Sequence, residues 1–157
     1  MAPGGPDGEA PVSENDASLV LRLDWRGVAF LFTGDIGPRA EDALLAQGLV
    51  GRIHVLKVAH HGSRFGTTRE FLAAARPLLA VVSAGARNPF GHPRPETLAR
   101  LRDAGARIYR TDRDGAVIVE TDGRALWVTR WALGTTDRFA LDHEPHPAGA
   151  ETSSRTP

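Results

Sequence analysis

Short apolar runs alternate with helix-like segments along the middle of the chain, and this alternation constrains the fold more than any other feature. The apolar runs are rich in branched and aromatic residues, which favour strands. The helix-like segments carry apolar residues at helical spacing, and two of them begin with proline, which suits a first helical turn. The predicted strands are 18–25, 28–34, 53–59, 78–85, 106–111, 115–121 and 124–131, and the predicted helices are 38–48, 67–77 and 95–105.

The resulting order, ββαβαβαβββ, predicts an α/β or α+β fold in which outer helices cover layered sheets. Arg26 and Gly27 separate the first two strands and predict a hairpin. The run 78–85 is almost continuously apolar, which is typical of a strand covered on both faces.

Both ends of the chain have the composition of linkers. Residues 1–16 are rich in proline, glycine and acidic residues, and we predict a disordered linker there. Residues 133–157 show no sustained periodicity, so we predict a disordered tail, which includes His143 and His146. A single compact domain is therefore expected over residues 17–132.

Composition excludes several classes of protein. The chain of 157 residues has 19 basic and 19 acidic side chains, so no overall field attracts nucleic acid. It has no cysteine, which leaves only His, Asp and Glu as strong metal ligands. No apolar run approaches the roughly 20 residues of a membrane span, and the N-terminus lacks the features of a signal peptide. As written, the chain is expected to be cytoplasmic.

Three predicted strands each end in a loop that carries potential metal ligands or polar contacts. Asp35 follows the second strand, His60 and His61 follow the third, and Asn88 and His92 follow the fourth. Because ligands gather beyond the carboxyl ends of strands in layered α/β sheets, we expect Asp35, His60, His61 and His92 to share one pocket. Such side chains suit Zn, Mn or Fe. Taken singly, Asp35 could be a helix cap and His92 a turn residue.

The same loops carry a family resemblance. The runs NDASLVLRL, FLFTGD, VLKVAHHGS and GARNPFGHP, followed by YRTDRDGAVIVETDG, resemble in order and separation the metallo-β-lactamase-like domain of ComEC. ComEC proteins are inner-membrane channels for DNA uptake in bacterial competence. The resemblance extends from about Glu14 to Trp131 and implies a parent protein in the inner membrane, with this domain outside the cytoplasm.

The resemblance implies roles for individual residues. Asp35 would bridge two divalent metal ions, Zn or Mn. Either His60 or His61 would be a metal ligand; we favour His60, with His61 as an outer contact or a contact to substrate. The expected substrate is single-stranded DNA, hydrolysed at its phosphodiester bonds. Four residues are expected to contact substrate: Ser63, Asn88, His92 and, more weakly, Asn15.

One motif of the family is absent. The HxHxDH run that supplies most metal ligands from the N-terminal half of the αββα fold does not occur in this sequence. Asp35 and one histidine are too few for the three or four protein ligands of a catalytic zinc. The chain is therefore expected to be the C-terminal half of an αββα sandwich, with an exposed apolar face, which requires the N-terminal half or a partner chain for activity.

Two other functions remain open at this stage. The chain could be a non-catalytic remnant or a DNA-binding segment, or a related hydrolase could act on a small phosphoester or acyl substrate. Arg64, Arg69, Arg87 and Arg94 lie near the predicted site loops and could contact phosphates. The alternative interpretation of these arginines is an ordinary solvated surface.

Overall fold

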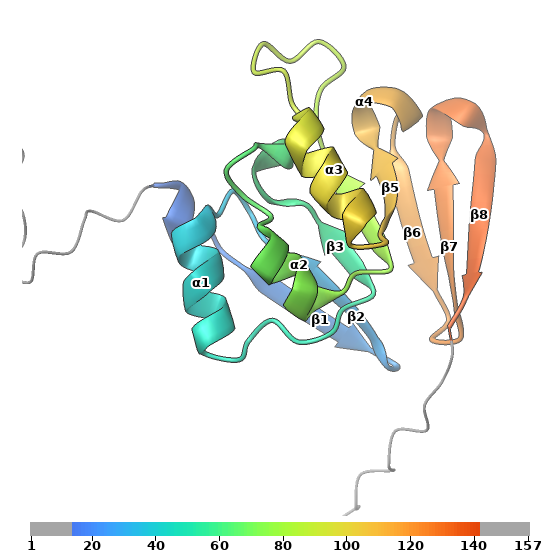
Figure 1. Cartoon of the computed structure of the whole chain (residues 1–157). Helices are drawn as coiled ribbons and strands as arrows, with labels where there is room; N and C mark the ends of the chain where they lie inside the picture. Colours follow the sequence, from blue (N-terminus) through green and yellow to red (C-terminus); the bar gives the residue numbers. More distant parts are fainter. Residues whose placement is uncertain (1–13, 142–157) are drawn as a thin grey trace, which may run out of the picture.

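The computed structural model describes residues 14–141, which contain two β-sheets and a layer of helices (Figure 1). The larger sheet has five strands in the order β1-β2-β3-β4-β5. β1 is antiparallel to β2, whereas β2, β3, β4 and β5 are parallel. Their bounds are β1 Leu21–Trp25, β2 Val28–Phe32, β3 Val55–Lys57, β4 Leu79–Val82 and β5 Arg107–Arg110.

Three helices cover one face of this sheet: α1 Pro38–Ala46, α2 Arg69–Ala75 and α3 Pro95–Asp103. Alternate residues of the strands face them, so that Ala29, Leu31 and Leu56 pack with Phe71 and Leu101 in a buried cluster. Proline at the start of α1 and α3 matches the predicted helix starts. The Thr68 side chain caps α2 by accepting a hydrogen bond from the backbone N–H of Phe71.

A second, antiparallel sheet has the order β6-β7-β8. Its strands are β6 Val117–Thr121, β7 Ala125–Arg130 and β8 Thr135–Ala140. The other face of the five-stranded sheet packs against it, through Val55, Leu79 and Tyr109 on one side and Leu126 and Val128 on the other. Short helical segments complete the described chain: η1 Asn15–Ala17, η2 Ala59–Gly62, α4 Thr111–Asp114 and η3 Trp131–Leu133.

The predicted α/β class is confirmed, and so is the hairpin at Arg26 and Gly27, where both residues have positive φ as a two-residue turn requires. The assignment as half of an αββα sandwich stays a prediction. In the part of the chain that the structure describes, no helix is long and apolar enough to cross a membrane.

The C-terminal boundary differs from the prediction. Residues 135–140 were expected in a tail but form β8, so the boundary at 133 falls inside folded structure. Gly134 turns the chain back with a positive φ, and β8 then pairs along the whole of β7. The polar sequence of β8 lacks the apolar alternation that marks the other strands, so its pairing with β7 is not visible in the local pattern. Likewise η1 begins at Asn15, inside the expected linker, whereas His143 and His146 lie outside the described residues.

One part of the larger sheet stays uncovered. In the β1–β2 hairpin, Leu21 lies opposite Phe32, and Leu23 lies opposite Phe30, so these side chains share a face. The three-stranded sheet covers this same face at β3, β4 and β5. At the hairpin, however, four apolar side chains remain exposed: Leu21, Leu23, Trp25 and Phe32. The described structure thus presents an apolar strip where a sandwich would continue.

Tyr109 ties the two sheets together. Its hydroxyl donates a 2.8 Å hydrogen bond to the Asp137 carboxylate of β8, and its ring is buried between the sheets. Burial, together with the hydrogen bond to Asp137, raises the pKa of Tyr109 to about 12. The neutral phenol is therefore favoured in the folded state more than in the unfolded state.

We predict that the stability contributed by Tyr109 is complete below about pH 10, the ordinary tyrosine pKa, and is lost as pH rises towards about 12. Tyr109 is the sole tyrosine of the chain, so the tyrosinate absorbance of the folded protein reports this residue alone. The absorbance should titrate near pH 12. Tyr109→Phe should lower the free energy of unfolding by about 1 kcal/mol at neutral pH. A midpoint near pH 10 in the folded protein would contradict the buried hydrogen bond.

Candidate functional site

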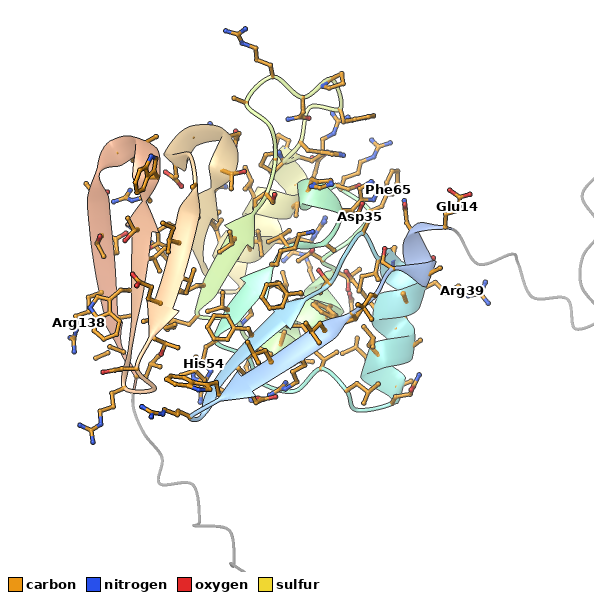
Figure 2. All side chains as sticks on the ribbon, turned by 180° about the vertical axis from the view of Figure 1, so that it is seen from behind. Glu14, Asp35, Arg39, His54, Phe65 and Arg138 are labelled. Carbon is orange, nitrogen blue, oxygen red and sulfur yellow. The ribbon has the colours of Figure 1, made fainter. Side chains whose placement is uncertain are left out.

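The candidate site lies at the edge of the five-stranded sheet where the parallel strands β2, β3 and β4 end. Asp35 follows β2, His60 and His61 lie in η2 after β3, and Ser83 begins the loop after β4. Parallel pairing brings these three loops to the same edge, since neighbouring strands are only about 4.8 Å apart. Figure 2 labels Asp35 at this end of the molecule.

His60 and His61 occupy an unusual backbone conformation. Both have left-handed φ and ψ values, with φ of 46° and 54°, where non-glycine residues are uncommon. The His60 N–H donates to the Gly34 carbonyl at 3.1 Å, and the Ser63 N–H donates to the His60 carbonyl at 2.8 Å. These bonds hold a conformation that costs about 1–3 kcal/mol per residue and is typical of functional sites.

The His61 ring connects the loops after β4 and β2. Its Nδ1 lies 2.7 Å from the Ser83 carbonyl oxygen. Because a carbonyl oxygen can only accept a hydrogen bond, Nδ1 carries the proton and is the donor. The opposite nitrogen, Nε2, then carries a lone pair in the neutral ring and lies 3.7 Å from Oδ1 of Asp35. Two ligands of one tetrahedral zinc ion lie roughly 3.3 Å apart, so this separation is close to that of a ligand pair.

Asp35 is contacted by groups from two other segments, the residues before β1 and the end of β3. Its backbone N–H donates to the Ser18 hydroxyl at 3.1 Å, and its carboxylate lies 3.9 Å from the Lys57 ammonium. Lys57 also donates a 3.1 Å hydrogen bond to the Gly34 carbonyl. Burial lowers the pKa of Lys57, and the neighbouring Asp35 carboxylate opposes that change. A half-buried cation therefore stands beside the candidate ligand.

The remaining imidazoles extend the cluster. The ring centroids of His60 and His92 are 5.8 Å apart, and those of His60 and His61 are 6.4 Å apart. Burial, followed by the charges of His60 and Arg94, lowers the pKa of His92, which favours the neutral ring. Its Nδ1 is buried and has no hydrogen-bond partner among the described residues.

Of the other residues expected to contact substrate, Asn88 and Ser63 form side-chain hydrogen bonds within the protein. The Asn88 amide donates to the Gly85 and His92 carbonyls, while its oxygen accepts from the His92 N–H at 2.9 Å, so it orders the loop that carries His92. Ser63 is only 3% exposed, and its hydroxyl accepts a hydrogen bond from the Phe65 N–H. Asn15 is exposed in η1. The contacts of Asn15, Ser63 and Asn88 with substrate stay predictions.

Two ionic side chains that the sequence did not reveal, one buried and one partly buried, hold the loop after η2. Glu41 of α1 is fully buried, and its carboxylate accepts hydrogen bonds from the backbone N–H groups of Thr67 and Thr68. Burial raises the pKa of Glu41. The hydrogen bonds from Thr67 and Thr68 lower it, but burial has the larger effect. Arg100 of α3 donates to the carbonyls of Arg64, Gly66 and Thr67.

The donors fit a divalent metal in kind but not in number. Asp35 and His61 offer one oxygen and one nitrogen, which suit Zn or Mn. Across residues 14–141, no group of three or more His, Asp or Glu side chains is placed to hold one ion. The histidine beside Asp35 is His61, whereas His60 was the ligand that we expected, and the choice between them stays a prediction. Neither of two hollows on the described surface is lined by residues of this cluster.

Three curated proteins are similar to the chain. ComE operon protein 3 of Bacillus subtilis (strain 168) is 35% identical over 117 residues, which make up 74% of this chain and 15% of that protein. Competence protein ComA of Neisseria gonorrhoeae is 36% identical over 108 residues, 68% of this chain and 16% of that protein. Recombination protein 2 of Haemophilus influenzae is 34% identical over 107 residues, 68% of this chain and 13% of that protein.

These similarities establish that the chain is homologous to part of the ComEC-family competence proteins. The chain spans 13–16% of the length of these relatives. No family model matches it. The resemblance to the family is confirmed, whereas the identity of the matching domain stays a prediction.

Gly62 offers a test of the loop geometry. It has a φ of +82°, and a Cβ at this position would lie 2.6 Å from Cβ of Pro93. Gly105 has a similar φ of +78° but has no atom within 4 Å of the corresponding point. Gly105→Ala should therefore cost about 1 kcal/mol for backbone strain alone, and Gly62→Ala should cost a further 1–3 kcal/mol or so for the clash. Urea denaturation measures both, and equal losses would contradict the close approach of Gly62 to Pro93.

Proposed function

We propose that this chain is the C-terminal half of a metallo-β-lactamase-like hydrolase domain in a ComEC-like protein, and that the complete domain cleaves single-stranded DNA during DNA uptake. The observation that carries the proposal is the convergence of Asp35 and His61, 3.7 Å apart, at the edge of a parallel sheet. Homology to competence proteins supports the biological setting. The parent protein would lie in the inner membrane, with this domain outside the cytoplasm.

In the proposed site, Asp35 and one of the paired histidines would hold divalent metal ions, Zn or Mn. Such ions supply an activated water and positive charge for phosphodiester hydrolysis. The chain's own contribution is positioning: the Ser83 carbonyl orients His61, and the Ser18 hydroxyl orients the Asp35 backbone. Lys57 adds a charge that could attract a phosphate. The neutral ring of His92 would contact the substrate from the loop after β4.

The remaining ligands are proposed to come from the N-terminal half of the domain or from a partner chain. The exposed strip of Leu21, Leu23, Trp25 and Phe32 supports this view, because a packed sandwich would bury such a face. The N-terminal half or the partner chain would therefore complete both the metal site and the hydrophobic core.

A non-catalytic role in DNA binding is the second candidate. It is favoured by the lack, among residues 14–141, of a complete ligand set for one ion. The two candidates differ in one measurable property, since only the hydrolase requires Asp35 for turnover once the N-terminal half is present.

The first experiment compares site variants. The chain alone should bind Mn²⁺ or Zn²⁺ weakly and should show little nuclease activity, and adding the N-terminal half should raise hydrolysis of single-stranded DNA. In this reconstituted domain, Asp35→Ala should lower the rate by more than the roughly 100-fold that loss of an outer-shell partner can cost. His143→Ala is the control and should retain full activity. Robust cleavage by the chain alone, unchanged by Asp35→Ala, would overturn the proposal.

The histidine variants decide which ring binds metal. If His61 is the ligand, His61→Ala should weaken calorimetric metal binding in the reconstituted domain about as much as Asp35→Ala, and His60→Ala should weaken it less. The reverse order would support the assignment to His60 that we favoured from the sequence.

A separate experiment tests the exposed strip. Leu23→Asp should leave the fold of the chain intact, because this side chain is half exposed, but should weaken association with the N-terminal half. Loss of one buried leucine costs roughly 1.5–3 kcal/mol, or about 10- to 150-fold in affinity. Leu133→Asp is the matched control, since Leu133 is equally exposed but lies in η3, away from the strip. Sedimentation measures association, and equal effects of the two variants would contradict the interface.

A further inference from the structure

Two exposed phenylalanines stand on the loops that carry the histidine cluster. Phe65 follows η2 and is 63% exposed, and Phe90 lies in the loop after β4 and is 67% exposed. Single exposed apolar side chains are common on proteins, so exposure alone carries no argument. Their surroundings distinguish these two rings.

Phe90 continues a row of rings that leads to Asp35. Its ring stacks on His92 with centroids 6.0 Å apart and planes 20° apart. The ring centroids of His92 and His60 are 5.8 Å apart, and those of His60 and His61 are 6.4 Å apart. Nε2 of His61 then faces Asp35. A flat group stacked on Phe90 would thus lie at one end of the cluster.

Phe65 lies at the Asp35 end of the cluster. A Cβ on Gly66 would lie 2.9 Å from the carbonyl oxygen of Ile36, so the loop after η2 passes directly over the residue that follows Asp35. Figure 2 labels Phe65 beside Asp35 at the same end of the molecule. The backbone on either side of Phe65 is fixed by Arg100, which donates to the carbonyls of Arg64 and Gly66. The ring is therefore presented on a well-bonded loop.

Both rings are accompanied by arginines. The Arg64 guanidinium lies 4.7 Å from the centroid of the Phe65 ring. Arg94 places its guanidinium within 3.5 Å of a Cβ built at Gly91, next to Phe90. Arg64, Arg87 and Arg94 are exposed, whereas Arg69 forms an ion pair with Asp103 at 3.0 Å. Because the chain has no net charge, an anionic ligand must be attracted by such a local group.

We propose that Phe65 and Phe90 are stacking platforms for the bases of a single-stranded nucleic acid, and that the adjacent arginines contact its phosphates. The proposal rests on the proposed function and names how that site recognises its substrate. Exposed aromatic rings with interspersed arginines suit a single strand, since its unpaired bases offer free faces, whereas the bases of a duplex are already stacked. The two platforms would hold a strand across the Asp35–His61 pair.

The test measures binding rather than cleavage. A fluorescent oligothymidylate and an abasic oligonucleotide of equal length are titrated with the full chain in the presence of a chelator, so hydrolysis does not contribute. The wild-type chain should prefer oligothymidylate. Phe65→Ala and Phe90→Ala should each weaken its binding by about 5- to 150-fold, the range measured for loss of one stacked base, and should leave abasic binding unchanged. Phe90→Trp should restore the affinity.

Trp131→Ala is the matched control, because Trp131 is 70% exposed but lies in η3, outside the loops of the site. It should bind both oligonucleotides as the wild type does. Equal wild-type affinity for the two oligonucleotides, or an unchanged affinity in the double alanine variant, would overturn the proposal. If the chain prefers oligothymidylate but the reconstituted domain does not hydrolyse DNA, the stacking proposal stands and the proposed nuclease activity is refuted. Failure of one proposal can therefore be distinguished from failure of the other.

Discussion

The parallel pairing of β2, β3 and β4 is the constraint on which the rest of the structure depends. Phe30 lies opposite Val55, and Val55 lies opposite Leu79, so the three strands run in the same direction in adjacent positions. Their following loops must then leave the sheet at one edge. The His61 ring uses this arrangement directly, since it contacts the loop after β4 through one nitrogen and faces Asp35 with the other.

Side chains then fix the strand ends that the pairing brings together. The Thr33 hydroxyl donates to the Lys57 carbonyl at 2.8 Å, and the Lys57 ammonium donates to the Gly34 carbonyl, so β2 and β3 are joined beyond their last ladder bonds. Glu41 and Arg100 bind the loop after η2 from two different helices. A site of this kind is preorganised by its scaffold, which limits the motion of the histidines.

The sequence predicts the local elements of this fold well, because its apolar periodicities and turn residues agree with the final structure. The hairpin at Arg26 and Gly27 and the proline starts of α1 and α3 are examples. It does not reveal β8, whose polar residues are held by pairing with β7, nor the buried contacts of Glu41. Such features depend on partners far along the chain, and no local pattern encodes them. The position of the His61 ring relative to Asp35 depends in the same way on Ser83.

The left-handed backbone at His60 and His61 has a consequence for how this segment can vary. A position with this conformation accepts glycine at no steric cost and accepts asparagine or aspartate at a low cost, whereas β-branched residues are strongly disfavoured there. Chains that lost the need for an imidazole would therefore drift first towards glycine and asparagine at these two positions. Retention of both histidines in a related chain would instead indicate that the imidazoles are still used, because glycine would relieve the backbone strain at both positions.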